Sequence, residues 1–444
     1  MTDLKATSSP SLALSDAFQA HTQRVSSGPH ALPELRKRAF AKFQTLGWPT
    51  TKEETWRFTN PKPLSDASFQ IAEPPSVWPA KEIGESYFLA ETHRLVFVNG
   101  HFYKEWSTSA DLPLGCTLQH LSEPGVADQT HVRQALKGFQ NSAAQFGSLN
   151  TAFLDSGAVL HLASNTQLDK PLHILHINTA TTTPHMVHPR LMVFAMANSS
   201  ASIVETFLGP DSGSYWVNHV TQLHLAAGAQ MKHYLVQFGS EQSFHTANFQ
   251  ARLEANSCLV SNQFLTGARL MRNNLNLHLL GEGSECEING LTLGHNQQTL
   301  DNHIEMNHVA PHCNSRQYFK TILDDNAHGV FGGRVVVFQE AQKTDAQQTN
   351  RNLLLSENAR IDTKPQLEIY ADDVKCAHGA TTGQIDEDAL FYLASRGLDP
   401  KAAREVLLYA FAHEVLDRVE IQGILDQVEH VLLSRFSQRH LFGG

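Results

Sequence analysis

The chain has 444 residues, with 34 basic and 44 acidic side chains and a formal net charge of -10. An acidic balance argues against nucleic acid as a partner, because binding to a phosphate backbone calls for a basic surface. No apolar run reaches the roughly 18 residues of a membrane-spanning helix, and no secretory signal begins the chain. The five cysteines include no Cys-x-x-Cys pair. We therefore expect a soluble cytoplasmic protein with reduced thiols.

The first third of the chain has mixed character. Residues 1–30 are rich in Ser, Ala and Thr with weak periodicity, which predicts a flexible N-terminus. Apolar residues then recur at helical spacing from Leu32 to Leu46, and Gly47 ends that pattern. Several prolines mark an irregular connector, and Leu95–Gly100 follows as a short strand. We expect residues 31–148 to form an N-terminal region of helices and mixed structure.

Residues 149–383 show a repeat. Short alternating strands meet small corner pairs, and the corners at positions 200, 228, 256, 283 and 314 follow one another at intervals of 27 to 31 residues. The corner pairs are Gly157-Ala158, Ser200-Ala201, Gly228-Ala229, Asn256-Ser257, Gly283-Ser284, Asn314-Ser315 and Asn358-Ala359. Such a period without helix-length segments favours a parallel β-helix, whose coils bury their inward side chains against one another. A β-sandwich is the alternative, since regular strands and turns are common to both folds.

Residues 384–444 predict a small helical domain. Asp386 or Glu387 can begin a first helix that Gly397 closes. Asp399 is a predicted N-cap with Pro400 at the first helical position, opening a helix over Lys401 to Arg418. Ile421 to Phe436 forms the last helix. We expect this domain to be mounted on the open end of the solenoid.

Motifs for self-contained catalysis are missing from the sequence. It has no phosphate-binding Gly-x-x-x-x-Gly-Lys-Ser/Thr loop, no Gly-x-Gly-x-x-Gly opening a helix, no Gly-x-Ser-x-Gly elbow and no His-Glu-x-x-His helix. If energy from ATP is used, another subunit must therefore supply it.

Cys376 and His378 are the candidate metal ligands. In a strand, side chains two residues apart leave the same face, and a thiolate beside an imidazole suits zinc or iron. Two ligands leave a tetrahedral ion half coordinated, so the site is incomplete, transient or finished by another chain; a half-buried cysteine beside a hydrogen-bonded histidine is the purely structural alternative. A weaker second cluster comprises Asn302, His303, Glu305, His308, His312 and Cys313.

Several segments then make the sequence recognisable. Asn352–Ala359, Thr363–Thr381 with its Asp-Asp-Val-Lys-Cys-Ala-His-Gly-Ala-Thr run, Phe391–Gly397 and Glu414–Asp417 closely resemble the SufD branch of the SufB/SufD family, which belongs to the SUF machinery of iron–sulfur cluster assembly. Glu54–Thr59, Val96–Gly100, Leu149–Phe153 and Gln342–Ala346 support the resemblance, which covers about residues 35 to 420.

The resemblance implies a mainly β protein with a right-handed parallel β-helix core between an N-terminal helical region and a C-terminal helical domain. It implies a non-catalytic scaffold subunit that pairs with a SufB-like paralogue and binds a SufC-like ABC ATPase through its C-terminal helices. A transient iron–sulfur cluster or iron ion would be shared with the paralogue and not held stably by this chain alone. Carried onto this sequence, His378 is the first residue tied to iron supply and cluster assembly, and Cys376 the second. The ATPase-contact candidates are Val406, Tyr409, Ala410, Phe411 and Glu414.

The sequence departs from the SufB-like pattern at informative positions. SufB-like chains carry Glu-His-Glu-Ala where this chain has Cys376-Ala-His-Gly379, and a cysteine near the position of Asn350. Two rival functions remain: a homodimeric SufD-like form, whose open edge pairs with its own copy, and a stand-alone β-helix enzyme acting on carbohydrates. The enzyme would need carboxylates recurring at a fixed place in the repeats, which the sequence does not show.

Overall fold

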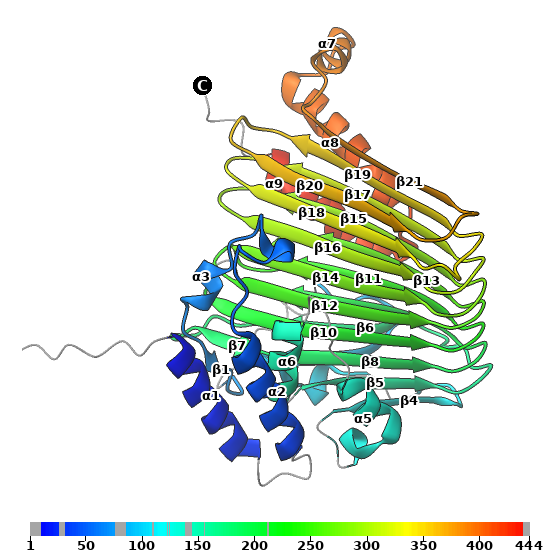
Figure 1. Cartoon of the computed structure of the whole chain (residues 1–444). Helices are drawn as coiled ribbons and strands as arrows, with labels where there is room; N and C mark the ends of the chain where they lie inside the picture. Colours follow the sequence, from blue (N-terminus) through cyan, green and yellow to red (C-terminus); the bar gives the residue numbers. More distant parts are fainter. Residues whose placement is uncertain are drawn as a thin grey trace, which may run out of the picture.

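Strands of about ten residues alternate between two sheets along the chain, and the sheets face each other as the walls of a parallel β-solenoid (Figure 1). The computed structural model describes residues 10–25, 32–75, 86–108, 111–121, 123, 125–137, 144–154, 156–210 and 213–437. Sheet A contains β1 (Gln70–Ile71), β4 (Cys116–His120), β5 (Ser156–Leu162), β7 (His185–Val187), β8 (Pro189–Ala195), β10 (Tyr215–Leu225), β12 (Phe244–Leu253), β14 (Leu270–Leu279), β16 (Thr299–His308), β18 (His328–Val337) and β20 (Arg360–Ile369). Sheet B contains β2 (His93–Val98), β3 (His101–Phe102), β6 (Leu172–Ile177), β9 (Ser200–Leu208), β11 (Gln230–Phe238), β13 (Cys258–Leu265), β15 (Glu285–Gly294), β17 (Asn314–Leu323), β19 (Asp345–Leu354) and β21 (Lys375–Gly383).

Each coil adds one parallel rung to each sheet. In sheet A, for example, Leu225 on β10 pairs with Leu253 on β12, and Leu253 pairs with Leu279 on β14. These leucines belong to the buried apolar core that fills the space between the sheets. Parallel pairing of every second strand confirms the predicted β-helix and excludes the β-sandwich, whose neighbouring strands run antiparallel.

Corner residues with positive φ set the period of the coils. At the corners leading into sheet B, these residues are Asn198, Gly228, Asn256, Gly283, His312 and Lys343, at intervals of 27 to 31 residues. Three of the predicted corners, Gly228, Asn256 and Gly283, are confirmed in this series. A Cβ on Gly228 would lie 2.3 Å from Oδ1 of Asn198, so glycine is needed there for space as well as for backbone conformation.

The predicted corners at Gly157, Ser200 and Asn314 are wrong, because these residues lie in β5, β9 and β17. Asn314 is the first residue of β17, and the left-handed residue of that corner is His312 with φ of 59°. Lysine is uncommon in this conformation, and most histidines of the chain lie elsewhere, so composition alone does not reveal the corners at His312 and Lys343.

The N-terminal region contains α1 (Pro10–Val25), α2 (Pro33–Leu46), α3 (Lys62–Ser65), α5 (Thr130–Leu136) and α6 (Ala144–Ala152), with short 3-10 turns η1 (Glu54–Trp56), η2 (Lys104–Trp106) and η3 (Val126–Asp128). The prediction of a flexible segment over residues 1–30 is wrong for residues 10–25, which form α1. Phe18 on α1 stacks on Phe40 of α2 with ring centroids 4.0 Å apart. Residues 1–9 and 26–31 lie outside the described residues.

The solenoid begins earlier than the predicted boundary at residue 149. Strand β2 pairs in parallel with β6 and so forms a rung of sheet B, while β4 runs antiparallel to β5 in sheet A. α1, α2 and α6 pack on the outer face of sheet A, where Trp216, Phe244 and Leu270 receive them. The N-terminal region is thus part of the solenoid at one end and a cover for sheet A along its side.

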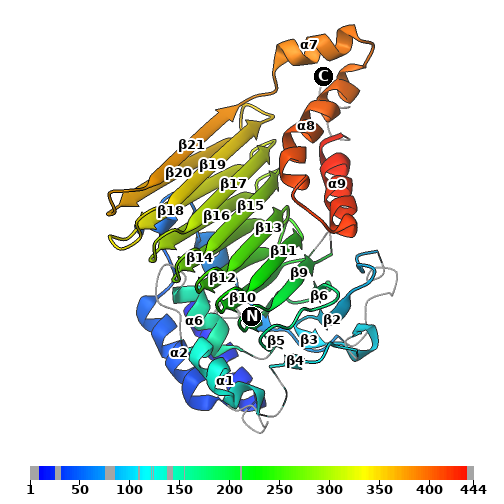
Figure 2. The same ribbon diagram turned by 90° about the vertical axis from the view of Figure 1, so that its right-hand side faces the viewer.

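The C-terminal helices are α7 (Glu387–Ser395), α8 (Pro400–Leu416) and α9 (Gln422–Ser437), close to the predicted bounds. Asp386 and Asp399 are their N-caps, since each carboxylate accepts two backbone N–H bonds from the first turn that follows it. α8 and α9 pack on the outer face of sheet B, and α7 projects beyond the last rung (Figure 2). The expectation that this domain sits on the open end is therefore wrong for α8 and α9.

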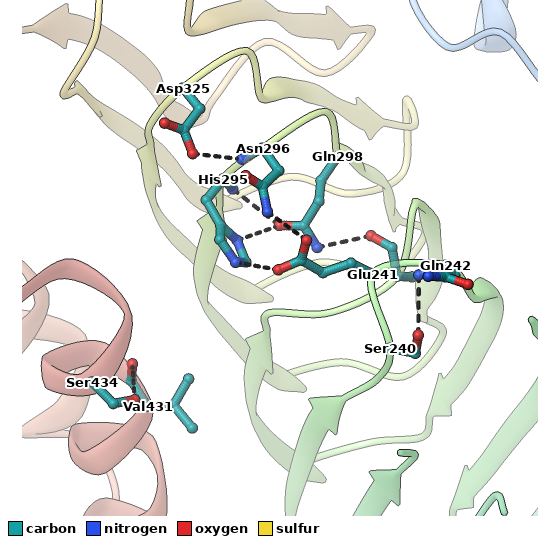
Figure 3. Close-up of polar contacts among 10 residues, drawn as sticks. Ser240, Glu241, Gln242, His295, Asn296, Gln298, Asp325, Val431 and Ser434 are labelled. Atoms are coloured by element: carbon teal, nitrogen blue, oxygen red, sulfur yellow. Dashed lines mark hydrogen bonds and ion pairs between the residues drawn. The ribbon is translucent and has the colours of Figure 1, made fainter. Parts of the chain in front are cut away.

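Polar contacts at the rim of the solenoid join corners that lie one or two coils apart (Figure 3). Nε2 of His295 lies 2.5 Å from a carboxylate oxygen of Glu241, and Nδ1 of His295 lies 2.7 Å from the amide oxygen of Gln298. The backbone N–H of Asn296 donates to Asp325 at 2.9 Å. These contacts fix the corners between sheets B and A. Among the helices of the described residues, none has the length and apolar character to cross a bilayer.

Candidate metal-ligand site at the open end of the solenoid

No strand or helix of the described residues caps the last rung of the solenoid. β20 and β21 are the terminal strands of sheets A and B, and each pairs with a neighbour on one side only. Every residue from Ala377 to Gly383 on β21 is exposed, whereas the strands deeper in the solenoid are largely buried. A strand edge of this kind presents unpaired backbone N–H and C=O groups that another polypeptide can pair with.

Cys376 and His378 both lie on this rung, on the strand face directed toward the interior of the solenoid. Cys376 pairs in register with Ala346, and His378 with Gln348, both of which are buried. The Cys376 side chain is half-buried and packs on the core between the sheets, while His378 is exposed. The predicted strand geometry is confirmed, and neither side chain is sealed inside the chain.

The protonation state of Cys376 follows from its surroundings. Burial raises the pKa of the Cys376 thiol, Asp345 adds to that rise, and a hydrogen bond from the Ala346 backbone opposes it. Because the thiolate is the form that binds metals, an incoming ion must displace the thiol proton. Cys376 is therefore not activated in advance, and metal binding at this rung would release a proton.

Within the described residues, no three His, Cys, Asp or Glu side chains are grouped so that they could hold a metal ion. The predicted second cluster is accordingly wrong. His308 points into the solenoid and lies 2.8 Å from the hydroxyl of Ser315, whereas Cys313 lies 3.2 Å from the hydroxyl of Ser284. The side chain of His303 is on the opposite strand face from that of His308, as expected for residues an odd number apart.

The ATPase-contact candidates on α8 divide into two groups. Val406, 45% exposed, and Ala410 are on the open surface of the helix. Tyr409 donates to Glu429 of α9 at 2.8 Å. The backbone carbonyl of Phe411 and the carboxylate of Glu414 both accept from Lys320 on sheet B, so these two candidates join α8 to the solenoid.

Two exposed aromatic residues on α7 were missed from the sequence. Phe391 is 76% and Tyr392 56% exposed, and α7 buries none of its residues in this chain. Both residues fall outside the apolar stripe of Leu390, Leu393 and Ala394, and that mismatch was the available signal. Adjacent exposed aromatic side chains on a projecting helix are typical of a contact surface for another protein.

In comparison with known proteins, two family models match the chain. The family model for the SufBD core domain of SUF system FeS cluster assembly matches residues 176–411, and the model for the SufBD protein N-terminal region matches residues 9–174. The first match spans the solenoid from β6 to the middle of α8, and includes Cys376 and His378.

Relatives cover nearly the whole chain. An iron–sulfur cluster assembly SufBD family protein of Synechocystis is 37% identical over 89% of this chain and 90% of its own length. The iron–sulfur cluster assembly protein SufD of Escherichia coli is 32% identical over 96% of this chain and 97% of its own. The chloroplastic protein ABCI7 of Arabidopsis thaliana is 29% identical over 94% and 89%. This chain is therefore a member of the SufBD family of iron–sulfur cluster assembly proteins.

Proposed function

We propose that this chain is a non-catalytic scaffold subunit that pairs with a SufB-like paralogue and a SufC-like ABC ATPase to support iron acquisition and cluster formation. The observation that carries the proposal is the uncapped terminal rung bearing Cys376 and His378. A second strand added to the edge of β21 would bring ligands of the paralogue next to these two side chains. A transient iron ion or iron–sulfur cluster would then be shared by both chains.

α7 and α8 provide the surface for the ATPase. Phe391, Tyr392 and Val406 are exposed on α7 and α8, while Phe411 and Glu414 tie α8 to sheet B. ATP binding that draws the helical domains together would pull on sheet B through α8 and strain the paired terminal rungs. Cys376 and His378 would thereby become accessible to incoming iron or sulfide.

The test of the shared site is His378→Ala in cells that depend on this pathway, with the maturation of an iron–sulfur enzyme as the readout. Loss of maturation with normal abundance of the complex is expected. His430→Ala, an exposed change on α9, is the matched control. Full maturation with His378→Ala would rule out the assigned role.

The test of the ATPase surface is co-purification. Phe391→Ser with Tyr392→Ser should weaken recovery of the ATPase while leaving the paralogue bound, because the two surfaces lie on different elements. Unchanged recovery of the ATPase would place its contact elsewhere.

A homodimer is the second candidate, and it is favoured by the same uncapped rung, which could pair with its own copy. Light scattering of the isolated chain and of the chain with the paralogue separates the homodimer from the heterodimer. A dimer of two copies of this chain that persists in excess paralogue would favour the homodimer. Membership in an iron–sulfur assembly family favours either form over an enzyme acting on carbohydrates.

A further inference from the structure

Gln348 lies beneath the exposed rung, in register with His378. The two residues pair on β19 and β21, and both side chains are directed toward the solenoid interior. Neighbouring parallel strands are about 4.8 Å apart, so side chains stacked in this way are within reach of one ion. Gln348 is 2% exposed, which places its amide under the rung and away from bulk water.

The amide of Gln348 is held in place from two sides. Its Nε2 donates to Oε1 of Gln317, one rung deeper, at 2.8 Å. Across the interior, Gly333 on β18 leaves the space that this amide occupies, because a Cβ there would lie 2.1 Å from Nε2 of Gln348. The hydrogen bond orients the amide, and the glycine leaves the space that the amide fills. Together they preorganise the side chain.

Among the described residues, the oxygen of this amide has no hydrogen-bond partner. Oε1 of Gln348 is buried without a hydrogen bond, as is Nε2 of Gln317. Leaving a buried polar atom unsatisfied costs about 1–3 kcal/mol, so such an atom calls for a water, an ion or a ligand. The neighbouring amides of Asn350 and Asn352 each also have one unsatisfied buried atom, so the interior beneath the last rung is polar on the β19 side.

We propose, building on the proposed function of this rung, that Gln348 supplies a carboxamide oxygen as the third ligand of this chain to iron held by Cys376 and His378. An oxygen, a nitrogen and a sulfur donor together suit a first-row divalent metal and leave a position open for the paralogue or for sulfide. Binding forms the sulfur–metal bond and breaks the S–H bond of Cys376, whose proton leaves to solvent, while His378 and Gln348 bind as neutral groups. Rotating the amides of Gln317 and Gln348 together by 180° reverses their hydrogen bond but keeps it. The metal would select the orientation in which the oxygen of Gln348 faces it.

The experiment is an anaerobic titration of the full chain with Co²⁺, a spectroscopic substitute for Fe²⁺, followed by the thiolate-to-metal charge-transfer absorption. Gln348→Leu removes the oxygen and is expected to weaken Co²⁺ binding by about tenfold or more. Gln348→Glu retains an oxygen ligand and is expected to bind at least as tightly as the unaltered chain.

Gln317→Leu is the matched control, because it breaks the same hydrogen bond one rung further from the ion. It loosens the Gln348 amide without removing a ligand, so it should weaken Co²⁺ binding less than Gln348→Leu does, with circular dichroism confirming that all variants are folded. A loss of affinity shared equally by Gln317→Leu and Gln348→Leu would show a packing effect and overturn the inference.

His378→Ala separates this inference from the function on which it rests. If His378→Ala loses Co²⁺ while Gln348→Leu binds normally, Gln348 is not a ligand but the site remains. If the unaltered chain does not bind Co²⁺, or if His378→Ala and Gln348→Leu both bind it normally, the metal site itself is wrong.

Discussion

Lys320 on β17 and Glu414 on α8 form an ion pair with 2.9 Å between Nζ and the carboxylate oxygen, and it joins the outer face of sheet B to the C-terminal helices. The Lys320 side chain is 1% exposed and that of Glu414 52% exposed. The ammonium also donates to the backbone carbonyl of Phe411 at 2.6 Å. Hydrogen bonds from Tyr318 and Lys320 lower the pKa of Glu414, so the carboxylate remains charged to lower pH than usual. A buried cation thus depends on one helix for its partners.

Glu414→Ala should therefore destabilise the attachment of α8. The change leaves the Lys320 ammonium buried with one acceptor fewer, and the expected loss in free energy of unfolding is about 1–3 kcal/mol. Urea denaturation followed by circular dichroism measures it. The control is Glu405→Ala on the same helix, whose partner Lys401 lies 4.0 Å away at the surface. That control should cost less than about 0.5 kcal/mol, and equal losses in the two variants would contradict the role assigned to Lys320.

Asp301→Ala tests the attachment of the N-terminal segment to sheet A. Asp301 pairs with Arg272, and both side chains are fully buried. The hydroxyl of Thr59 donates to the same carboxylate, and the Arg272 guanidinium lies 4.6 Å from the ring centroid of Trp56. Removing one member of a buried pair leaves an uncompensated charge, so we expect a loss of about 3–5 kcal/mol in chemical denaturation.

The control for Asp301→Ala is Glu54→Gln in the same segment. Glu54 pairs at 2.6 Å with Lys364 at the protein surface, where screening by solvent makes ion pairs weak. A loss below about 1 kcal/mol is expected for Glu54→Gln. If Asp301→Ala costs no more than this control, the buried pair does not anchor the segment.

The repeat period of the corners and the capping residues of the helices made most of the fold predictable. Gly228, Asn256 and Gly283 mark real corners because their residue types favour positive φ, and Asp386 and Asp399 mark real N-caps because their carboxylates accept backbone N–H groups. What the sequence could not show was how α8 and α9 attach. Their docking on sheet B rests on contacts between residues about 90 positions apart, such as Lys320 with Glu414, and no local pattern encodes them.

The candidate site was predictable only where it depends on local geometry. Cys376 and His378 stand two residues apart on one strand, so their common face follows from local geometry. Gln348 was missed because it joins them only through the pairing of β19 with β21, which depends on the register of the coils. Phe391 and Tyr392 could not be predicted from the helical pattern, because their exposure depends on how α7 projects from the solenoid.

His312→Gly should stabilise the solenoid. His312 is exposed at a corner with φ of 59°, a conformation that costs a residue with a Cβ roughly 1–2 kcal/mol, partly offset by the greater freedom of glycine in the unfolded chain. The expected net gain is about 0.5–1 kcal/mol in thermal or urea unfolding. Asn314→Gly is the control two residues on, at the start of β17, and should cost about 0.5–1 kcal/mol because it places glycine in a strand. Destabilisation by both changes would contradict the assigned corner.

Buried histidines should make the solenoid sensitive to acid. Burial lowers the pKa of His173, His176, His188 and His245 to about 3 in each case. A histidine that is neutral in the fold and has its ordinary value of 6.5 when unfolded contributes stability that is fully present above pH 6.5. That stability is lost as the pH falls toward 3, by about 1.4 kcal/mol per pH unit for each group. Unfolding at fixed temperature, followed by circular dichroism from pH 8 to pH 3, should show a cooperative acid transition.

His176→Phe should move that acid transition to lower pH. The His176 ring stacks between Phe97 and Phe207, with centroids 5.1 and 4.6 Å away, and an aromatic ring without a titrating nitrogen can take its place there. Without this histidine the unfolded state binds one proton fewer, so less free energy of unfolding is lost per pH unit. The variant should therefore unfold at lower pH than the unaltered chain, even if it is slightly less stable at pH 8. His430→Gln, an exposed change on α9, is the control for altered histidine content and should leave the transition in place. An acid midpoint that His176→Phe leaves unchanged would mean that this buried ring does not set the acid limit.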